Sequence, residues 1–426
     1  MDYQHCLNHL KTLGDEVLRI RSGLETMKAI LKTMGNPHLN YPCILVAGTN
    51  GKGSTARFIS SITSASGLLT GRFSSPHLIT VRERICLNEV PVERRTFTES
   101  FSRMLEATHS ADLSRKPTYF EAITATALDL FSRQKVNLAV LEVGMGGLLD
   151  STNVVEPVLS TITPISIDHQ LHLGTTLEEI ASQKAGIIRS SRPVLTAPQH
   201  PRVARVLQDI AINKNASFTM LNSDQIEANH LTKGQYQISY RNIKANLGVL
   251  GQHQIINAAL ATESVMKLDI SGKKISKNCI LKGLTGVQPC GVLHPIACNP
   301  DIFVDGGHNP HAAKAVATFL SNHTKEPRHL IVSMMKDKDL NTVSAILSPL
   351  FDKIDLFELP SIRAANSVQL QDAFPQGRLI QNLSQALMKS RGKASSVLVF
   401  GSFQLVGKVL REWGNLTEKN SYYHSI

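Results

Sequence analysis

Residues 43–59 constrain the fold of this chain more than any other segment. The apolar run at 43–46 predicts a buried strand, and a helical pattern opens at Thr55. Between them lies a glycine-rich loop whose backbone amides can face a phosphate at a helix N-terminus. Lys52 can reach the terminal phosphates, and Ser54 can offer its hydroxyl to Mg2+. This context predicts a nucleoside triphosphate site rather than a glycine turn with a chance lysine, formed by Gly48, Thr49, Asn50, Gly51, Lys52, Gly53, Ser54 and Thr55.

Composition is that of an ordinary globular protein with two or three domains. The 426 residues are 42% hydrophobic and 19% charged, which suits a chain with full-sized cores. The net charge of +11 allows nucleic acid, an anionic surface or small anionic substrates as partners. Because the basic residues are dispersed and have no aromatic interleaving, we expect a solvated basic surface and small anions, and no nucleic acid.

Three features bear on the compartment of the protein. The six cysteines show neither paired nor metal-binding spacing, which is typical of free thiols in a reducing cytosol. The N-terminal residues lack the basic and apolar regions of a secretion signal. No apolar stretch is long enough to span a membrane. We therefore expect a cytoplasmic protein without membrane association.

Short apolar runs alternate with longer amphipathic segments, as in a mostly parallel sheet wrapped by helices. Strands are expected at 136–143, 158–162, 193–197, 302–304, 330–333, 354–359 and 397–400, with an antiparallel strand at 235–240. Helices are expected at 96–107, 120–133, 177–189, 202–211 and 252–266. Residues 271–274 and 283–298 together are rich in glycine, proline and lysine, which indicates a domain boundary near 286–292. The prediction is an α/β fold with a P-loop domain at 1–287 and a smaller α/β domain at 288–426.

Polar side chains follow two of the expected strands. Glu142 lies near the end of a buried run and precedes a glycine-rich segment, and Asp168-His169 follows the run after it. The carboxyl ends of parallel strands are where α/β proteins bind ligands. Glu142 is therefore expected to hold Mg2+ beside the phosphate loop, and His169 to bind metal through a neutral imidazole. A solvent-exposed glutamate and a structural histidine are the plainer alternatives.

The loop Gly-Thr-Asn-Gly-Lys-Gly-Ser at 48–54 resembles that of the Mur-type ligases, and among them the folylpolyglutamate synthase and dihydrofolate synthase family. Similar motifs recur in the expected order over residues 34–407, nearly the whole chain. They include Lys184-Ala185-Gly186-Ile187, the stretch from Gly251 to Ala259, and Asp305-Gly306-Gly307-His308-Asn309-Pro310. The resemblance implies a Rossmann-like second domain, and ATP and two Mg2+ ions at the site.

The resemblance also assigns roles to residues whose chemistry alone leaves them ambiguous. It implies that Ser75 binds Mg2+ and that Lys184, otherwise read as an exposed helical lysine, is carbamylated by CO2. It implies a pterin ring against Phe120, otherwise an ordinary core residue. Folate-binding residues would be Thr118, Phe120, Asp150 and Ser151; nucleotide contacts would come from Asn257 and Asp305; and glutamate contacts would come from His308 and Ser402.

Two departures from the family pattern affect the expected activity. The family carries Pro-Gly-Arg at the hinge between the domains, where this chain reads Pro289-Cys290-Gly291-Val292. Bifunctional bacterial members usually carry Gly-Gly-Arg-Leu-Asp, where this chain has Leu148 in place of the arginine. Loss of a cation that stabilises the transferring phosphate would cost several kcal/mol of barrier if no other group replaced it.

The sequence therefore predicts a monomeric ATP-dependent ligase that adds L-glutamate to dihydropteroate, to folylpolyglutamate or to both through an acyl phosphate. Its expected catalytic residues are Lys52, His169, Lys184, Asp305 and His308. Three alternatives remain: a weakened relative that binds ATP and folate without turnover, a Mur ligase of cell-wall synthesis, and a P-loop switch or motor. The phosphate loop begins too early for the extra domain of a cell-wall ligase, and the motif at Asp305 argues against a motor.

Overall fold

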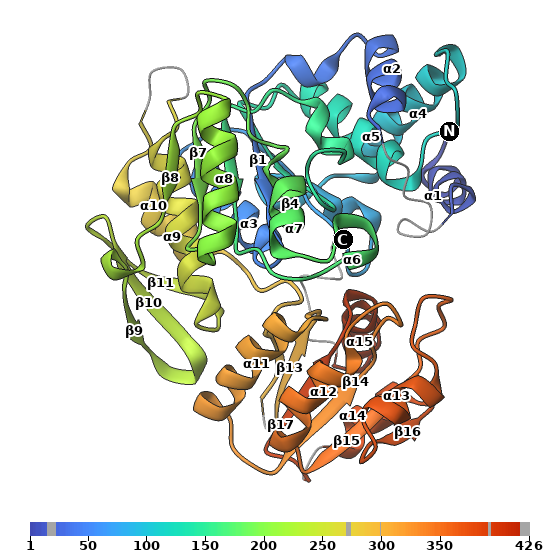
Figure 1. Ribbon diagram of the computed structural model, residues 1–426. Helices are drawn as coiled ribbons and strands as arrows, with labels where there is room; N and C mark the ends of the chain where they lie inside the picture. Colours follow the sequence, from blue (N-terminus) through green and yellow to red (C-terminus); the bar gives the residue numbers. More distant parts are fainter. Residues whose placement is uncertain (15–22, 270–273, 299, 391–392, 418–426) are drawn as a thin grey trace.

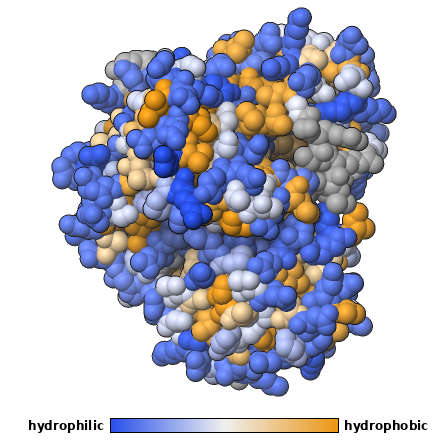
Figure 2. Space-filling model, in the orientation of Figure 1, coloured by the Kyte–Doolittle hydropathy of each residue, from blue (hydrophilic) through white to orange (hydrophobic). Residues whose placement is uncertain are grey.

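A computed structural model describes residues 1–14, 23–269, 274–298, 300–390 and 393–417. Figure 1 shows two layered α/β halves, the first running from blue to yellow and the second from orange to red. Each half is built around its own sheet, and a small third sheet belongs to the first half. The face drawn in Figure 2 is mostly polar, with apolar side chains in separate patches. No helix in the described part of the chain is long and apolar enough to span a membrane.

The first half contains an eight-stranded sheet in the order β4-β3-β2-β5-β1-β6-β7-β8. All its pairings are parallel except those of β3 with β2 and with β4. The strands are β1 (Cys43–Ala47), β2 (Thr70–Phe73), β3 (Ile85–Leu87), β4 (Val90–Pro91), β5 (Leu138–Glu142), β6 (Leu159–Ile162), β7 (Val194–Thr196) and β8 (Phe218–Met220). The predicted buried strand at 43–46 is confirmed as β1, in the middle of the sheet.

Helices cover both faces of this sheet because the central strands are apolar on both sides. Ile44 and Val46 pack into one core with α3 (Lys52–Ala65), α9 (His253–Met266) and α10 (Lys277–Gly286). Leu45 and Ala47 point into the other core, which includes α4 and α5. The remaining helices of this half are α1 (Tyr3–Thr12), α2 (Glu25–Thr33), α4 (Arg94–Ser110), α5 (Tyr119–Arg133), α6 (Gln170–Leu173), α7 (Leu177–Ala185) and α8 (Pro201–Asn213).

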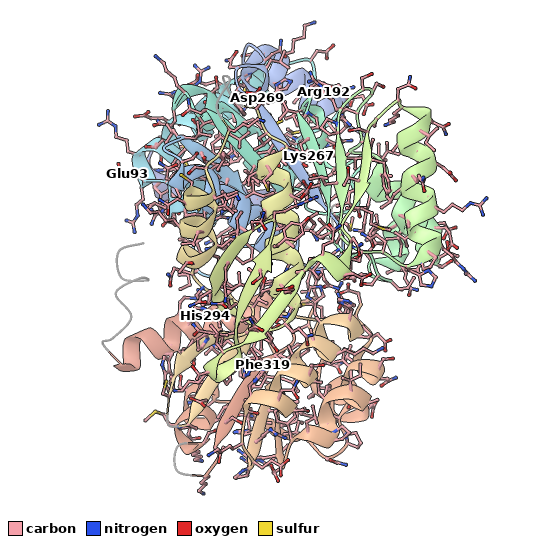
Figure 3. All side chains as sticks on the ribbon, turned by 90° about the vertical axis from the view of Figure 1, so that its left-hand side faces the viewer. Glu93, Arg192, Lys267, Asp269, His294 and Phe319 are labelled. Atoms are coloured by element: carbon pink, nitrogen blue, oxygen red, sulfur yellow. The ribbon has the colours of Figure 1, made fainter. Side chains whose placement is uncertain are left out.

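A three-stranded antiparallel sheet extends from the first half toward the second. Its strands are β9 (Glu227–His230), β10 (Gln235–Tyr240) and β11 (Ile243–Leu250), and β10 confirms the antiparallel strand predicted at 235–240. Tyr236 Oη lies 3.4 Å from His323 Nε2, and the His323 ring packs edge-on against Phe319. Figure 3 shows Phe319 where this sheet meets the second half. The two halves therefore touch at a point away from the hinge.

The second half contains a six-stranded sheet in the order β12-β13-β17-β14-β15-β16. Only β12 is antiparallel to its neighbour. The strands are β12 (His294–Ala297), β13 (Asp301–Asp305), β14 (Arg328–Val332), β15 (Lys353–Phe357), β16 (Arg378–Ile380) and β17 (Ser396–Phe400). The helices are α11 (Pro310–His323), α12 (Leu340–Leu347), α13 (Ser367–Ala373), α14 (Leu383–Ser390) and α15 (Phe403–Thr417). The predicted α/β class, with a parallel-rich first sheet and a second α/β unit, is confirmed.

Two details of the sequence prediction were wrong. The glycine- and proline-rich composition that begins at residue 283 predicts irregular structure there, but residues 283–286 form the last turn of α10. Gly283 packs against the backbone of Ile62, where a Cβ atom would collide. This glycine therefore permits close packing of α10 on α3. The helix expected at 177–189 ends earlier, at Ala185, because the chain turns there toward β7.

Candidate active site

The glycine-rich loop joins a buried strand to a helix, as the sequence predicted. It leaves β1 at Ala47 and enters α3 at Lys52, so the helix begins three residues earlier than expected. Gly51 has φ 89°, in the left-handed region, and a Cβ atom there would collide with the amide of Asn257. The amides of Thr49 and Asn50 donate to Pro164 O at 3.0 and 3.3 Å. These bonds fix the loop against the segment that leads to His169.

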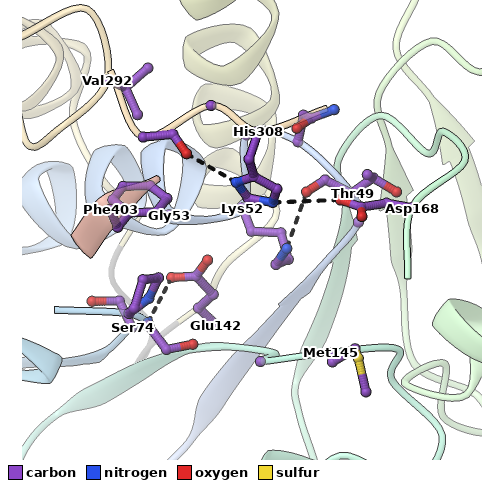
Figure 4. A pocket seen from close by; sticks show the side chains of 18 of the residues that line it. Thr49, Lys52, Gly53, Ser74, Glu142, Met145, Asp168, Val292, His308 and Phe403 are labelled. Carbon is purple, nitrogen blue, oxygen red and sulfur yellow. Dashed lines mark hydrogen bonds and ion pairs between the residues drawn. The ribbon is translucent and has the colours of Figure 1, made fainter. Parts of the chain in front are cut away.

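Lys52 is held only lightly by the protein. Its Nζ donates to Thr49 O at 3.2 Å (Figure 4). Ser54 Oγ, in the first turn of α3, accepts from Gln254 Nε2 at 3.3 Å. Gln254 also accepts from Asn257 Nδ2 at 3.0 Å within α9, so its bond to Ser54 connects a hydrogen-bonded pair of α9 residues to the first turn of α3. The loop, its lysine and its serine are thus oriented together at one helix N-terminus.

Glu142 lies at the end of β5, beside the loop. It is 4% exposed, so the solvent-exposed alternative is excluded. Its Oε2 accepts from the backbone amide of Ser75 at 3.3 Å, and a Cβ atom at Gly53 would lie 3.3 Å from the same oxygen. Burial raises the pKa of Glu142, and the charge of Lys52 opposes that effect. Figure 4 places this carboxylate between the Ser74 segment and Lys52.

Asp168 and His169 follow β6 on the same side of the sheet. His169 has φ 51° and is the N-cap residue that precedes α6. Burial lowers the pKa of His169 to about 3, so its imidazole is neutral near pH 7. Asp168 Oδ1 accepts from the backbone amide of His169 at 2.8 Å. The two Asp168 oxygens also accept from the second half, from Lys338 Nζ at 2.8 Å and Asn309 Nδ2 at 3.1 Å.

Lys184 is buried, which corrects its reading as an exposed helical lysine. It lies in the last turn of α7 and is 4% exposed. Its Nζ donates to Gly48 O at 2.7 Å. Burial, together with the charge of Lys52, lowers the pKa of Lys184 to about 7. A large fraction of these amines is therefore neutral at physiological pH.

The four residues predicted for the folate also line the cavity. Thr118 Oγ1 accepts from the amide of Glu121 and caps α5. Phe120 packs against Gly144, where a Cβ atom would lie 2.5 Å from its Cζ. The Asp150 oxygens accept from the amides of Thr152 and Met145, each at 3.0 Å. Asp150 therefore orders the glycine-rich loop that forms this wall, with Ser151 beside it.

The second half contributes Asp305, His308 and Ser402. Asp305, at the end of β13, accepts from the amides of Leu293 at 2.8 Å and Gly307 at 2.6 Å. Burial raises the pKa of Asp305 to about 6. His308 Nδ1 lies 2.9 Å from Gly306 O, and its Nε2 lies 3.7 Å from Asp168 Oδ2 (Figure 4). Ser402 Oγ accepts from the amide of Leu405 at the start of α15.

All of these residues surround one cavity. It has a volume of about 1200 Å³, and every predicted site residue except Thr55 lines it. Thr55 is fully buried within α3, so its expected contact with the nucleotide has no support in this geometry. Residues absent from the predicted set also line the cavity, and among them are Arg57, Arg72, Arg84, Asp168, Lys338 and Arg363.

The family follows from sequence comparison with known proteins. Residues 46–265 match the model of the Mur ligase middle domain, and residues 294–403 match the Mur ligase, glutamate ligase domain. The dihydrofolate synthase/folylpolyglutamate synthase of Bacillus subtilis is 34% identical over 369 residues, which cover 83% of this chain and 85% of that protein. The chain belongs to the folylpolyglutamate and dihydrofolate synthases, within the Mur ligases. It is an ATP-dependent ligase that forms amide bonds.

Other members of this Mur ligase family are similarly close in sequence and structure. The dihydrofolate synthase/folylpolyglutamate synthase of Escherichia coli is 30% identical over 95% of this chain and 94% of its own length. The folylpolyglutamate synthase of Mycobacterium tuberculosis, solved with ADP and AMPPCP, superimposes with a TM-score of 0.87 at 29% identity and covers 97% of this chain and 99% of that one. E. coli FolC in complex with DHPP and ADP gives a TM-score of 0.84 at 30% identity, with coverage of 96% and 97%.

The hinge of this ligase has no arginine, as its sequence indicated. Cys290 and Val292 line the cavity instead, and Gly291 O accepts from the amide of Gly306 at 2.8 Å. Guanidinium groups reach the cavity from other elements, including Arg57 of α3 and Arg72 of β2. Sequence reasoning missed these groups because no motif surrounds them.

Proposed function

We propose that this ligase joins L-glutamate to dihydropteroate, to a folylpolyglutamate or to both, with cleavage of ATP to ADP and phosphate. The main support is one cavity in which the phosphate loop, Glu142 and His169 of the first half face Asp305 and His308 of the second. Its volume of about 1200 Å³ exceeds that of most single-ligand pockets. It can therefore hold a nucleotide, a folate and glutamate together.

The residues around the phosphate loop fit Mg2+ as well as ATP. In the described part of the chain, no three His, Cys, Asp or Glu side chains lie close enough to hold a metal by themselves. Mg2+ characteristically takes one or two protein ligands and completes its shell with water and phosphate oxygens. We assign Ser54, Ser75, Glu142 and His169 as the protein ligands of two such ions, which would neutralise charge on the phosphates.

In the proposed reaction a substrate carboxylate oxygen attacks the γ-phosphorus of ATP. The bond to the β-phosphate oxygen breaks, ADP leaves, and an acyl phosphate forms. The amine of glutamate then attacks the acyl carbon, phosphate leaves with the bond electrons, and the nitrogen loses a proton. Lys52 binds the terminal phosphates, whose charge it stabilises in the transition state. His308 and Ser402, on the second half, are assigned to the incoming glutamate.

Lys184 is assigned as a carbamylated residue. A neutral amine is the form that adds to CO2, and burial lowers the pKa of Lys184 to about 7. Addition gives a carbamate anion and releases one proton. That anion would turn a buried cation beside Gly48 into a negatively charged group suited to Mg2+.

Thr118, Phe120, Asp150 and Ser151 are assigned to the folate. The Phe120 ring offers a flat apolar surface for a pterin, as stacked aromatic rings require. Asp150 would act by holding the loop around Gly147 in place, since its oxygens are occupied by backbone amides. We also propose domains at 1–287 and 288–426, divided in the segment between α10 and β12, and a monomeric protein.

The test is ADP release with Mg-ATP and L-glutamate, with dihydropteroate and tetrahydrofolate supplied in separate reactions. We expect release with at least one of them, together with a product heavier by one glutamyl residue. Release with dihydropteroate alone indicates a dihydrofolate synthase, and release with both indicates a bifunctional enzyme. Folded protein that binds ATP but releases no ADP with either would contradict the proposal. That result would favour the alternative of a relative that binds ATP and folate without turnover because its hinge lacks the arginine.

A further inference from the structure

Two arginines share one glutamate beneath the phosphate site. Arg72 Nε donates to Glu89 Oε1 at 2.8 Å, and Arg57 Nη1 lies 3.8 Å from Glu89 Oε2. Arg72 is 1% exposed. Its two other nitrogens donate to Ser74 Oγ at 2.5 Å and to Cys86 Sγ at 3.0 Å. A buried guanidinium with three fixed partners holds those partners in a single geometry.

Glu89 occupies a backbone conformation that a glutamate rarely adopts. It forms the tight turn between β3 and β4 with Asn88, and the two residues have φ 66° and 49°. Glycine is favoured at the second position of such a turn. Asn88 is fixed because its Oδ1 accepts from Thr70 N at 2.9 Å and Ser64 Oγ at 3.1 Å. Unfavourable backbone geometry of this kind persists where the surroundings impose it, and it concentrates at functional sites.

The cluster of Arg57, Arg72 and Glu89 connects directly to the residues assigned to Mg2+. Ser74, held by Arg72, precedes Ser75, whose backbone amide donates to Glu142 Oε2 at 3.3 Å. Arg57 lies on α3, one turn beyond Gly53, and lines the same cavity. The turn at Glu89 is therefore linked, through Arg72 and Ser74, to the position of Ser75 against Glu142.

We propose that Glu89 and Arg72 are positioning residues for the Mg2+ and phosphate end of the site. Glu89 anchors Arg72 and sets the distance between Arg72 and Arg57, and Arg72 holds residues 74–75 against Glu142. The two guanidiniums carry two positive charges and Glu89 carries one negative charge. The three groups together therefore place one net positive charge beside Glu142 and the phosphates. The inference rests on the proposed function only in assuming that nucleotide and Mg2+ bind at this loop.

The test compares Glu89→Gln with Glu93→Gln, a matched control on the outer surface at the start of α4 (Figure 3). ADP binding is measured by calorimetry over a range of Mg2+ concentrations, without folate or glutamate. Removing a group that orients metal ligands typically lowers metal affinity about 10- to 100-fold. We therefore expect Glu89→Gln to raise the Mg2+ concentration for half-maximal ADP binding at least about tenfold. The control should match the wild type.

A second variant covers the case in which Glu89→Gln does not fold. Ser74→Ala keeps the Arg72–Glu89 pair and removes only the link to residues 74–75, so the same shift is expected. A folded Ser74→Ala protein with a wild-type Mg2+ dependence overturns the proposal. So does a folded Glu89→Gln protein whose kcat falls while its Mg2+ dependence is unchanged. Because the binding readout needs no turnover, inactivity toward folates would contradict the proposed function and leave this inference standing.

Discussion

Lys338 Nζ donates a 2.8 Å hydrogen bond to Asp168 Oδ1, and the bond joins the two halves of the molecule at the active-site cavity. The two side chains are 6% and 9% exposed, so the ion pair is largely shielded from water. Asn50 and Asn309 exchange hydrogen bonds of 3.1 and 3.4 Å nearby. In the proposed reaction the first half binds the carboxylate to be activated and the second half binds the amine, so that reaction would require these contacts to hold the halves together.

Lys338→Met should weaken the contact between the two halves at the active-site cavity. Removing one partner of a buried ion pair costs about 3 kcal/mol or more, because the Asp168 carboxylate would stay charged and buried without the lysine that pairs with it. We expect kcat/KM for glutamate to fall about 100-fold. Steady-state kinetics would measure this, with Lys336→Met as the control because Lys336 lies in the same segment and is exposed. Equal effects of the two substitutions would contradict the assigned role.

Lys184 makes stability depend on pH. Its pKa is lowered to about 7 in the folded protein from 10.5, so between those values the unfolded chain binds more protons. The free energy of unfolding should therefore rise with pH in that window, by about 1.4 kcal/mol per pH unit. Lys184→Met should lack this rise. Urea unfolding at pH 7.5 and 9.5, in buffer free of CO2, would measure it, and parallel slopes for the two proteins would refute the effect.

Gly144→Ala should disturb folate binding selectively. The new methyl group would lie 2.5 Å from Phe120 Cζ, and the ring must move because the backbone of β5 and the loop is fixed. We expect KM for dihydropteroate to rise about tenfold, a loss of ~1.4 kcal/mol, with ADP affinity unchanged. Gly286→Ala provides the control, since its nearest neighbour would be 3.9 Å away. A changed ADP affinity with normal dihydropteroate binding would count against Phe120 as a folate residue.

Lys52→Ala and His169→Ala should each remove turnover without unfolding the protein. Lys52 Nζ donates to a backbone carbonyl at 3.2 Å, and the His169 side chain is only partly buried, so neither truncation opens a cavity in the apolar core. Loss of a group that stabilises transferring charge costs about 10²–10³-fold in kcat. Circular dichroism would verify folding and the ADP-release assay would measure the rate. A wild-type rate in either variant would remove that residue from the mechanism.

The parts of the fold and site that the sequence predicted depend on local pattern. One contiguous segment contains the buried strand at 43–46, the loop at 48–54 and the helix after it. Its sequence therefore predicts both the local structure and the kind of ligand. Glu142 and His169 were predicted from their position at strand ends, which parallel-sheet topology brings to one edge. The predicted site residues line one cavity, with Thr55 as the exception.

The parts that were missed depend on distant residues. Asp168 and Lys338 are separated by 170 positions, and no periodicity connects them. The Arg57–Glu89–Arg72 cluster depends on an unusual turn at Asn88 and Glu89, a sequence that gives no glycine signal. The sequence alone suggested an exposed Lys184 because the same helix exposes Glu179 and Ser182, whereas Lys184 is buried by tertiary packing that no local pattern records. Contacts between the two halves could therefore be identified only in the three-dimensional structure.

The most direct test of the account is the fate of oxygen in the carboxylate. Dihydropteroate, or tetrahydrofolate if that is the accepted substrate, would be labelled with 18O in the reacting carboxylate and converted with Mg-ATP and L-glutamate. Attack of that carboxylate on the γ-phosphorus must carry one labelled oxygen into phosphate for every amide formed. We predict one 18O in each phosphate released, measured by mass spectrometry. Unlabelled phosphate alongside glutamylated product would contradict the acyl-phosphate mechanism.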